Sequence, residues 1–171
     1  TGDVEVAEGA KLIINAGTTV NVPAGTFLNV KGAICAGDAA CGATQGSQSS
    51  PVRFLWGTPS NWSAEGRCYS PNSQVPLYNT DAACGGGVIV RNTIDEAITS
   101  LNFVHFEKAY GFPIYSANAQ KYLFGALIFD GANVDANGLS FSDINTSNVI
   151  AVNAASPVIS NSEFSLGVDG Q

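Results

Sequence analysis

Apolar residues recur at alternate positions in short segments of this chain, and Gly, Asn, Asp and Ser interrupt these segments every few residues. The pattern is clearest near the end, in GLSFSDI from Gly138, NVIAV from Asn148 and SPVISNSEF from Ser156. Successive side chains of a β-strand point to opposite faces, so alternation with period two indicates strands. The pattern therefore predicts many short strands and almost no helix.

A short repeat near the beginning narrows the fold further. Ala16-Gly17-Thr18 recurs eight residues later as Ala24-Gly25-Thr26, with LIIN before the first copy, VNVP between the copies and FLNV after the second. Eight residues accommodate about one strand and one turn. A repeat this short indicates a solenoid, in which Gly and Asn take tight corners and inward apolar side chains stack in ladders.

We therefore predict a parallel β-helix of roughly six or seven coils, with roughly 20 to 25 residues in each coil. The alternation places five large apolar side chains inside successive coils: Phe54, Ile89, Phe103, Phe141 and Ile159.

The composition agrees with an all-β chain. Of the 171 residues, 45% are hydrophobic and only 12% are charged, with 19 Gly and no Met. Helical proteins cover their outer faces with charged residues, about a quarter of the total, whereas Ser, Thr, Asn and Gly supply the polar face here. The length predicts a single domain over 1–171. Two segments, roughly 57–84 and 110–125, interrupt the strand pattern and are predicted to be loop insertions.

The charge distribution disfavours some partners, although an acidic surface also serves simply for solubility. The net charge is −7, and no Lys or Arg follows Lys121. An acidic surface repels phosphate groups, so we expect neither nucleic acid nor anionic lipid as a partner. No stretch approaches the roughly 18 apolar residues that span a bilayer, and no signal peptide is present. The lack of an initiator Met suggests a mature or excised fragment.

Four cysteines, Cys35, Cys41, Cys68 and Cys84, each lie in or beside a loop-like segment. Of the three possible pairings, Cys35 with Cys41 and Cys68 with Cys84 require the least loop closure. We predict these two disulfides, which would hold loops rather than the core. Reduced thiols and a metal site are the alternatives, although no pair has the CxxC spacing of a zinc site.

The residues also carry a family resemblance. LIINAGTTVNVPAGTFLNVKGAICAG from Leu12, with SSPVRFLWG from Ser49, resembles the opening of secreted bacterial and archaeal right-handed parallel β-helix proteins of the pectate-lyase-like superfold. The "PI.F" strand, the Gly-rich "GGI" strand and a later SPVIS coil of that family correspond, in order, to Pro51-Val52-Arg53-Phe54, Gly86-Gly87-Val88-Ile89 and Ser156-Pro157-Val158-Ile159-Ser160. The resemblance implies a right-handed parallel β-helix with an extracellular or cell-surface location. It implies no single activity, because this fold carries lyases, hydrolases, adhesins and phage spikes.

Candidate catalytic groups are few. Asn79-Thr80-Asp81 is similar to the first motif of the polygalacturonase-like branch, but its companion motifs are absent, and a turn capped by Asn and Asp accounts for it. For lyase chemistry the late basic residues are Arg91, His105, Lys108 and Lys121, and no carboxylate cluster is spaced to face them. We therefore expect no catalytic residue and no cofactor, and we assign no role to His105.

One segment resembles a calcium loop. Asp130, Asn133, Asp135 and Asn137 are its candidate ligands, but Ile144 stands where the bidentate Glu is required. A solenoid corner built from Asn and Gly is the alternative.

Aromatic residues and sequons offer candidate glycan contacts. Trp62, Tyr69 and Tyr78 lie in the first insertion, where aromatic rings either stack on sugars or cover the insertion against the coil. The other aromatic residues near the two insertions are Trp56, Tyr110, Phe112, Tyr115 and Tyr122. Asn61 and Asn145 begin sequons and are candidate glycosylation sites.

The ends of the solenoid suggest a function. No amphipathic capping helix precedes Val4 or follows Phe164, so unpaired strand edges are expected at both ends. We expect a structural or adhesive protein that associates through Val4 to Ile14 and Val158 to Leu166. Its partners would be other copies of itself or flanking coils of a longer chain. A carbohydrate-binding module and a polysaccharide-degrading enzyme stay open as alternatives.

Overall fold

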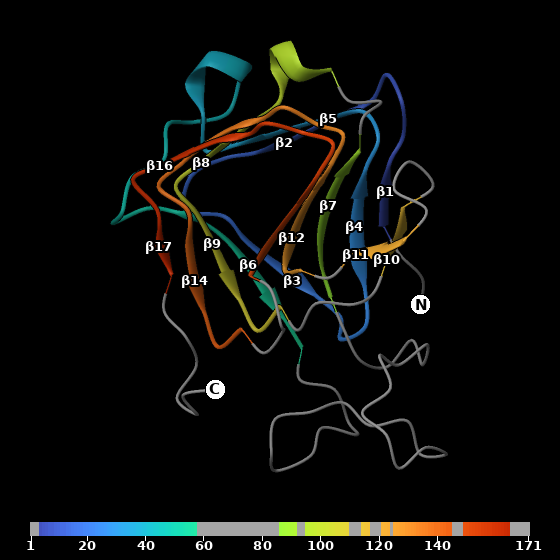
Figure 1. Cartoon of the computed structure of the whole chain (residues 1–171). Coiled ribbons are helices and arrows are strands. Elements are labelled where there is room, and N and C mark those ends of the chain that lie inside the picture. The colour runs from blue at the N-terminus through green and yellow to red at the C-terminus, as the bar shows by residue number, and fades with distance from the viewer. Residues whose placement is uncertain are drawn as a thin grey trace.

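The chain forms a right-handed parallel β-helix with a triangular cross-section, shown by the computed structural model in Figure 1. The structure describes residues 4–57, 86–91, 95–109, 114–116, 121–123, 125–144 and 149–164. Three parallel sheets of five strands each make the three sides of the triangle. The prediction of an all-β parallel solenoid is confirmed.

Each sheet takes one strand from every coil. Sheet A contains β1 (Val4–Val6), β4 (Phe27–Val30), β7 (Gly87–Arg91), β12 (Leu127–Asp130) and β15 (Ile150–Asn153). Sheet B contains β2 (Lys11–Ile14), β5 (Ala33–Ala36), β8 (Ser100–Asn102), β13 (Asp135–Asn137) and β16 (Val158–Ser160). Sheet C contains β3 (Thr19–Val22), β6 (Val52–Trp56), β9 (Val104–Glu107), β14 (Ser140–Ser142) and β17 (Glu163–Phe164).

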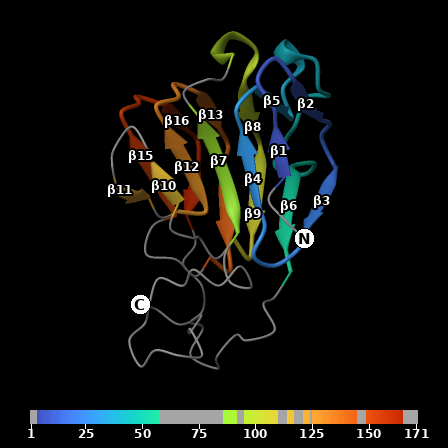
Figure 2. The same ribbon diagram turned by 90° about the vertical axis from the view of Figure 1, so that its right-hand side faces the viewer.

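The described strands make five stacked coils, which Figure 2 shows from the side. This corrects the expected six or seven coils. The difference arises because loops between strands use many residues. The loop between β5 and β6 carries a short 3₁₀ helix, η1 (Ala39–Cys41), and a second one, η2 (Glu96–Ile98), precedes β8. Within the second predicted insertion, β10 (Ile114–Ser116) and β11 (Lys121–Leu123) pair as an antiparallel hairpin.

The eight-residue repeat corresponds to one side of the triangle. Four-residue strands alternate with four-residue corners from β2 to β4, and Val4 pairs with Leu28 of the next coil. Gly17 and Gly25 lie at two successive corners with φ of 77° and 73°, a conformation that costs glycine little. The Ala-Gly-Thr repeat therefore marks corners of a single coil.

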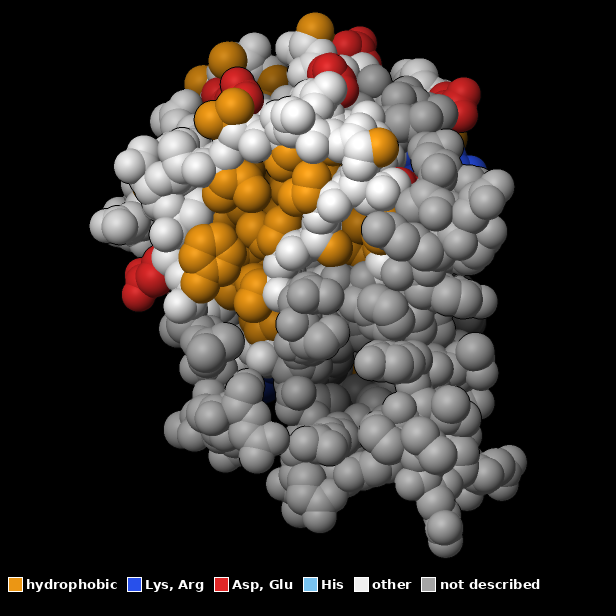
Figure 3. Space-filling model, viewed as in Figure 1, with side chains coloured by type: hydrophobic (Ala, Val, Ile, Leu, Met, Phe, Trp, Pro, Cys, Tyr) orange, Lys and Arg blue, Asp and Glu red, His pale blue; other side chains and the backbone are white. Residues whose placement is uncertain are grey.

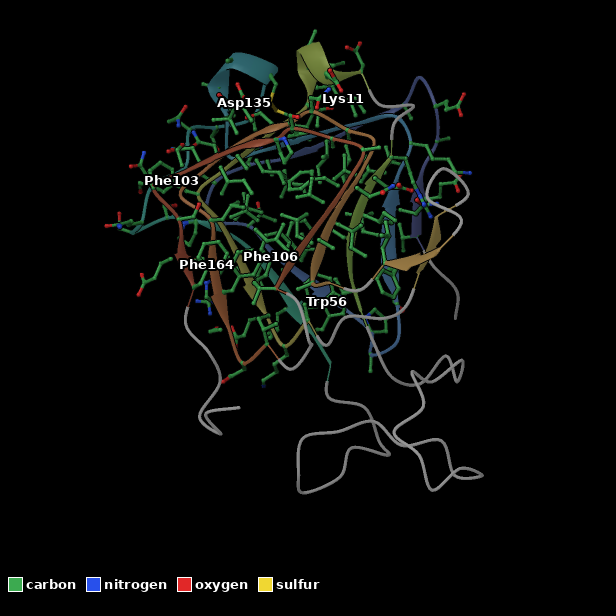
Figure 4. The ribbon with its side chains drawn as sticks, viewed as in Figure 1. Lys11, Trp56, Phe103, Phe106, Asp135 and Phe164 are labelled. Atoms are coloured by element: carbon green, nitrogen blue, oxygen red, sulfur yellow. A yellow bond between two sulfur atoms is a disulfide. The ribbon has the colours of Figure 1, made fainter. Side chains whose placement is uncertain are left out.

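The interior is apolar and packed in ladders. Phe54, Phe106, Phe141 and Phe164 occupy equivalent positions of sheet C, in register with Val20 of the first coil. Adjacent rings stack with centroids 5.7, 5.0 and 5.3 Å apart along this row. Figure 4 shows Phe106 and Phe164 directed into the coil. The inward orientation predicted for Phe54 and Phe141 is correct.

Ile159 also lies on the inner face, where it packs against the main core. Two of the predicted core residues, however, are placed differently. Ile89 is fully buried, but it belongs to a separate outer cluster with Leu123 of the hairpin and Ile128, while its neighbours Val88 and Val90 point into the main core. The hairpin covers this face of sheet A, so β7 is apolar on both faces and alternation does not reveal its register.

Phe103 lies at the corner between sheets B and C with φ of 50° (Figure 4). The chain bends between β8 and β9 at this residue, so the alternation continues from Leu101 to Val104 instead. Trp56, expected near the first insertion, is also in the core, and its indole nitrogen donates a hydrogen bond to the Thr26 carbonyl (3.0 Å).

Candidate functional site

Exposed apolar side chains in the described part of the chain concentrate at the two ends of the coil. Five large hydrophobic residues are exposed there: Val4, Ile13, Val152, Val158 and Phe164. The first two belong to the first coil and the last three to the fifth. The intermediate coils contribute none to this set. Large apolar groups left in water at both ends are the most distinctive surface feature of the described residues.

The final coil leaves the interior open to solvent. Phe164 is 51% exposed although it continues the stacked row of Phe141, and Val152 is 48% exposed although it continues the row of Phe129. Figure 3 shows a patch of apolar side chains inside the triangle of the last coil. Ile150, Ala155 and Ile159 are partly buried parts of the same surface. We term these five residues, Phe164, Val152, Ile150, Ala155 and Ile159, the open end.

The first coil covers its interior more completely. Val6 and Ile14 are buried, and Leu12, Val20 and Val22 are partly buried against the core. Val4, in the row that leads to Leu28, is 54% exposed.

Strand edges accompany the apolar surface at both ends. β1, β2 and β3 are the outermost strands at one end of their sheets, and β15, β16 and β17 are outermost at the other. Each of these strands pairs with a neighbour on one side only, within the described strands. Unpaired backbone N–H and C=O groups at such edges are templates for pairing with another chain. The ends thus offer hydrogen-bonding groups as well as apolar area.

A polar cluster on the outer face of sheet C was not predicted. The Nδ1 and Nε2 atoms of His105 lie 2.8 Å from Ser140 Oγ and 3.0 Å from Ser142 Oγ. Beside them, Arg53 forms an ion pair with Glu107 at 2.8 Å. The coil brings together the three strands β6, β9 and β14, and residues 54 positions apart meet, so no periodic signal in the sequence reveals the cluster.

The cluster does not have the geometry of a catalytic triad. In a triad, the acid and the serine contact opposite nitrogens of the histidine ring. Here Glu107 lies 3.9 Å from Nε2, the nitrogen that also meets Ser142, and its carboxylate is held by Arg53. Burial lowers the pKa of His105, and Arg53 lowers it further, against the opposing effects of Glu107 and Asp143. These hydrogen bonds and the ion pair hold the side chains together on the outer face of sheet C.

A second polar network crosses the outer face of sheet A. Asp130 is almost fully buried and forms an ion pair with Arg91 at 2.8 Å. Hydrogen bonds extend this pair across all five coils, with Arg91 donating to Asn29 (3.1 Å), Asn29 donating to Glu5 (3.2 Å) and Asn153 donating to Asp130 (2.8 Å). Lys31 lies 2.9 Å from Glu5 and completes the network. Charges satisfied in this way indicate a structural role.

The calcium candidates have other partners in the structure. Asp130 contacts Arg91 and Asn153, and the Asn133 side chain accepts a hydrogen bond from the Ser156 backbone. Asn137 belongs to a corner ladder, in which it donates to Asn102 (2.8 Å) and accepts from Ser160 and Asn161. Asp135 is exposed on sheet B. No group of three or more acidic, His or Cys side chains suited to a metal occurs among the described residues.

The predicted Cys35–Cys41 disulfide is present, with Cα atoms 5.7 Å apart. It closes the loop that follows β5, and Asp38 caps η1 within that loop by accepting from Ala40 N at 2.9 Å. Lys11 of the first coil donates to the Cys41 carbonyl, which ties the loop to β2. The bond therefore holds a loop, as the spacing suggested.

The remaining predicted site residues lie outside the described residues. These are Cys68 and Cys84, the aromatic residues Trp62, Tyr69 and Tyr78, the sequon residues Asn61 and Asn145, the Asn79-Thr80-Asp81 tripeptide, and Leu166 at the end of the predicted edge segment. Next to the first insertion, an open groove of about 480 Å³ is lined by residues that include Pro23, Leu55 and Lys108.

Comparisons with protein-family models, curated proteins and solved structures found no match to this chain. The parallel β-helix is therefore established by the strand topology, and the resemblance to the pectate-lyase-like superfold stays a sequence-based interpretation. None of the helices in the described residues is long and apolar enough to cross a membrane.

Proposed function

We propose that this chain is a structural subunit that associates with other copies of itself through the end coils of its β-helix. The observation that carries the proposal is that, among the described residues, the five exposed large hydrophobic side chains are confined to the first and last coils. In the described part of the chain, the large exposed apolar side chains lie at the ends of the coil, and this placement favours contact at the ends.

Two physical contributions support association there. A second coil placed on the open end would remove Phe164 and Val152 from water. Each is about half exposed, so its burial would contribute about half of the roughly 1.5–3 kcal/mol of a fully buried side chain. Edge strands would gain main-chain hydrogen bonds at the same time. The charged residues of the end segments are Glu5, Glu8, Lys11 and Glu163, so their net charge of −2 leaves only modest repulsion to oppose the contact.

We place this function outside the cell or at the cell surface. The Cys35–Cys41 disulfide supports this location, because such bonds persist in oxidising compartments. The family resemblance described above points to the same location.

The proposal is tested with two lysine substitutions in one row of sheet B. Val158 lies in the last coil and is 62% exposed, and Asp135 is its partner one coil inside, also exposed. Light scattering coupled to gel filtration measures the mass of the parent, Val158→Lys and Asp135→Lys over a range of concentrations. We expect concentration-dependent assembly of the parent and of Asp135→Lys. In Val158→Lys, the dissociation constant should rise at least about tenfold, which corresponds to about 1.4 kcal/mol.

Circular dichroism on all three proteins verifies that the fold is retained. A parent that stays monomeric at every concentration would overturn the proposal. Equal weakening by both lysine variants would show that charge, and not the end coil, controls assembly.

A further inference from the structure

We infer that the two ends of the β-helix are complementary to each other, so that copies of this chain join head to tail with strands in continuous register. This inference rests on the proposed function and adds the polarity and pairing of the joint. The last coil of one copy would act as the partner of the first coil of the next, as if the solenoid continued without interruption.

Strand direction favours this polarity. Sheets A, B and C are parallel, and each of their strands runs the same way around the coil. Head-to-tail stacking preserves that direction, so β15, β16 and β17 would each meet the strand of the same sheet in the next copy. A two-fold, end-to-same-end contact would reverse the strands and exchange at least two of the three sheets. Only the head-to-tail joint pairs each of the three sides with the same sheet of the next copy in the parallel direction.

The interior rows match across such a joint. On sheet A, Ile150 of one copy would lie next to Val4 of the following copy, and Val152 next to Val6. The members of each pair occupy the same row at opposite ends of the coil. On sheet C, Phe164 would pack on Val20, which begins the same row. Apolar residues thus meet apolar residues at each of these positions. The 54% exposed Val4 and the 51% exposed Phe164 would both become interior.

An outward row of sheet B provides an independent sign of the joint. Ile13 and Val158 point away from the core, yet they are 48% and 62% exposed hydrophobic residues. They are the first and last members of one row, whose intermediate members are Cys35, Ser100 and Asp135. Because both side chains point outward, packing in the core of the monomer does not account for an Ile and a Val at these positions. In the head-to-tail joint they become cross-strand neighbours and shield each other.

Charges at the joint are compatible with the same register. Glu5 of the first coil would face Ala151, and Glu163 of the last coil would face Thr19, because each pair shares a row. No like charges oppose each other in these rows. Five coils at about 4.8 Å spacing give about 24 Å of added length per copy.

The test uses two variants that block opposite ends of sheet A. Val4→Lys places a charge at the first coil, and Val152→Lys places one at the last; both residues are about half exposed, so the monomer should tolerate them. Sedimentation velocity is measured on each variant alone and on their equimolar mixture. We expect each variant alone to be monomeric and the mixture to form a 1:1 dimer and nothing larger, since only one compatible pair of ends remains.

The other outcomes separate the inference from the proposed function. If the parent assembles but either blocked variant forms a dimer by itself, the joint is head to head, which overturns the inference and retains end association. If both blocked variants assemble like the parent, the contacts lie elsewhere, and both fail. If the parent is monomeric, the proposed function fails first and the inference with it.

The register is tested separately by single cysteines. Thr19→Cys and Glu163→Cys lie at opposite ends of one outward row of sheet C. After mild oxidation, peptide mass spectrometry of a mixture of the two variants should detect an intermolecular disulfide that joins position 19 of one copy to position 163 of another. Each variant alone and the parent are the controls. A mixture that assembles but gives only disulfides between like positions, 19 with 19 or 163 with 163, would contradict the proposed pairing.

Discussion

The stacked phenylalanine row gives the sharpest prediction about stability. Phe106 is fully buried at the middle of this row, with its ring centroid 5.7 Å from that of Phe54 and 5.0 Å from that of Phe141. Phe106→Ala removes a large buried side chain from between two coils that cannot close the space without breaking register. The expected loss in the free energy of unfolding is about 3–5 kcal/mol.

Phe164→Ala is the matched control, because Phe164 stands in the same row but is 51% exposed at the open end. Full burial of a Phe side chain contributes about 1.5–3 kcal/mol, so half of that, about 1 kcal/mol, is expected from this substitution in the monomer. Urea unfolding followed by circular dichroism measures both variants in a Val158→Lys background, so that association does not contribute. A loss below about 1 kcal/mol for Phe106→Ala, or equal losses for the two variants, would refute the register of sheet C.

Three further predictions concern the corners and the polar networks. Gly138→Ala should destabilise the fold more than Gly9→Ala. Both glycines have positive φ, a conformation that costs other residues about 1–2 kcal/mol. Only at Gly138 would the added Cβ also clash, because it would lie 2.8 Å from a ring carbon of Phe103. Urea unfolding should rank the two variants in that order, and equal losses would contradict it. Arg91→Met should cost about 3 kcal/mol because it takes the guanidinium away from the buried Asp130 carboxylate, and adding Asp130→Asn should recover part of the loss in the same assay. Because the pKa of His105 is lowered in the folded state, the unfolded chain takes up this proton at higher pH, so stability should fall as pH drops below about 6.5; His105→Gln should lack this component in pH-dependent thermal unfolding.

The fold could be predicted because its main signals are local. Alternating apolar residues and the Ala16-Gly17-Thr18 repeat report one strand and one corner at a time, and the solenoid is built from such units. The Cys35–Cys41 disulfide could also be predicted, since short loops close at low entropic cost. The number of coils could not be predicted, because the loops between strands differ in length and conceal the repeat.

Errors in register arose where a local rule was overridden by a contact distant in sequence. Ile89 alternates with Val88 and Val90 in the expected way, but the hairpin that buries its outer face makes all three positions apolar. The alternation predicts an inward Phe103 only if it continues through the corner, where the backbone bends at positive φ. The burial of Ile89 on its outer face depends on a hairpin distant in sequence, whereas the bend at Phe103 is a local backbone conformation at a residue other than glycine.

The candidate site was predicted in outline and not in detail. The lack of capping helices in the sequence led to the expectation of free strand edges, and the structure places Val4, Val152 and Phe164 half exposed at those ends. The polar cluster of Arg53, His105 and Glu107 could not be predicted, because its members and the serines beside them meet only when three coils are stacked.

Association through the end coils is tested most directly by sedimentation velocity of the parent chain over a wide concentration range, beside the Val158→Lys variant. The account predicts a series of species in the parent that grow with concentration, and a shift of that series to at least about tenfold higher concentration in the variant. A single monomeric boundary for the parent at all concentrations, or identical behaviour of the two proteins, would contradict it.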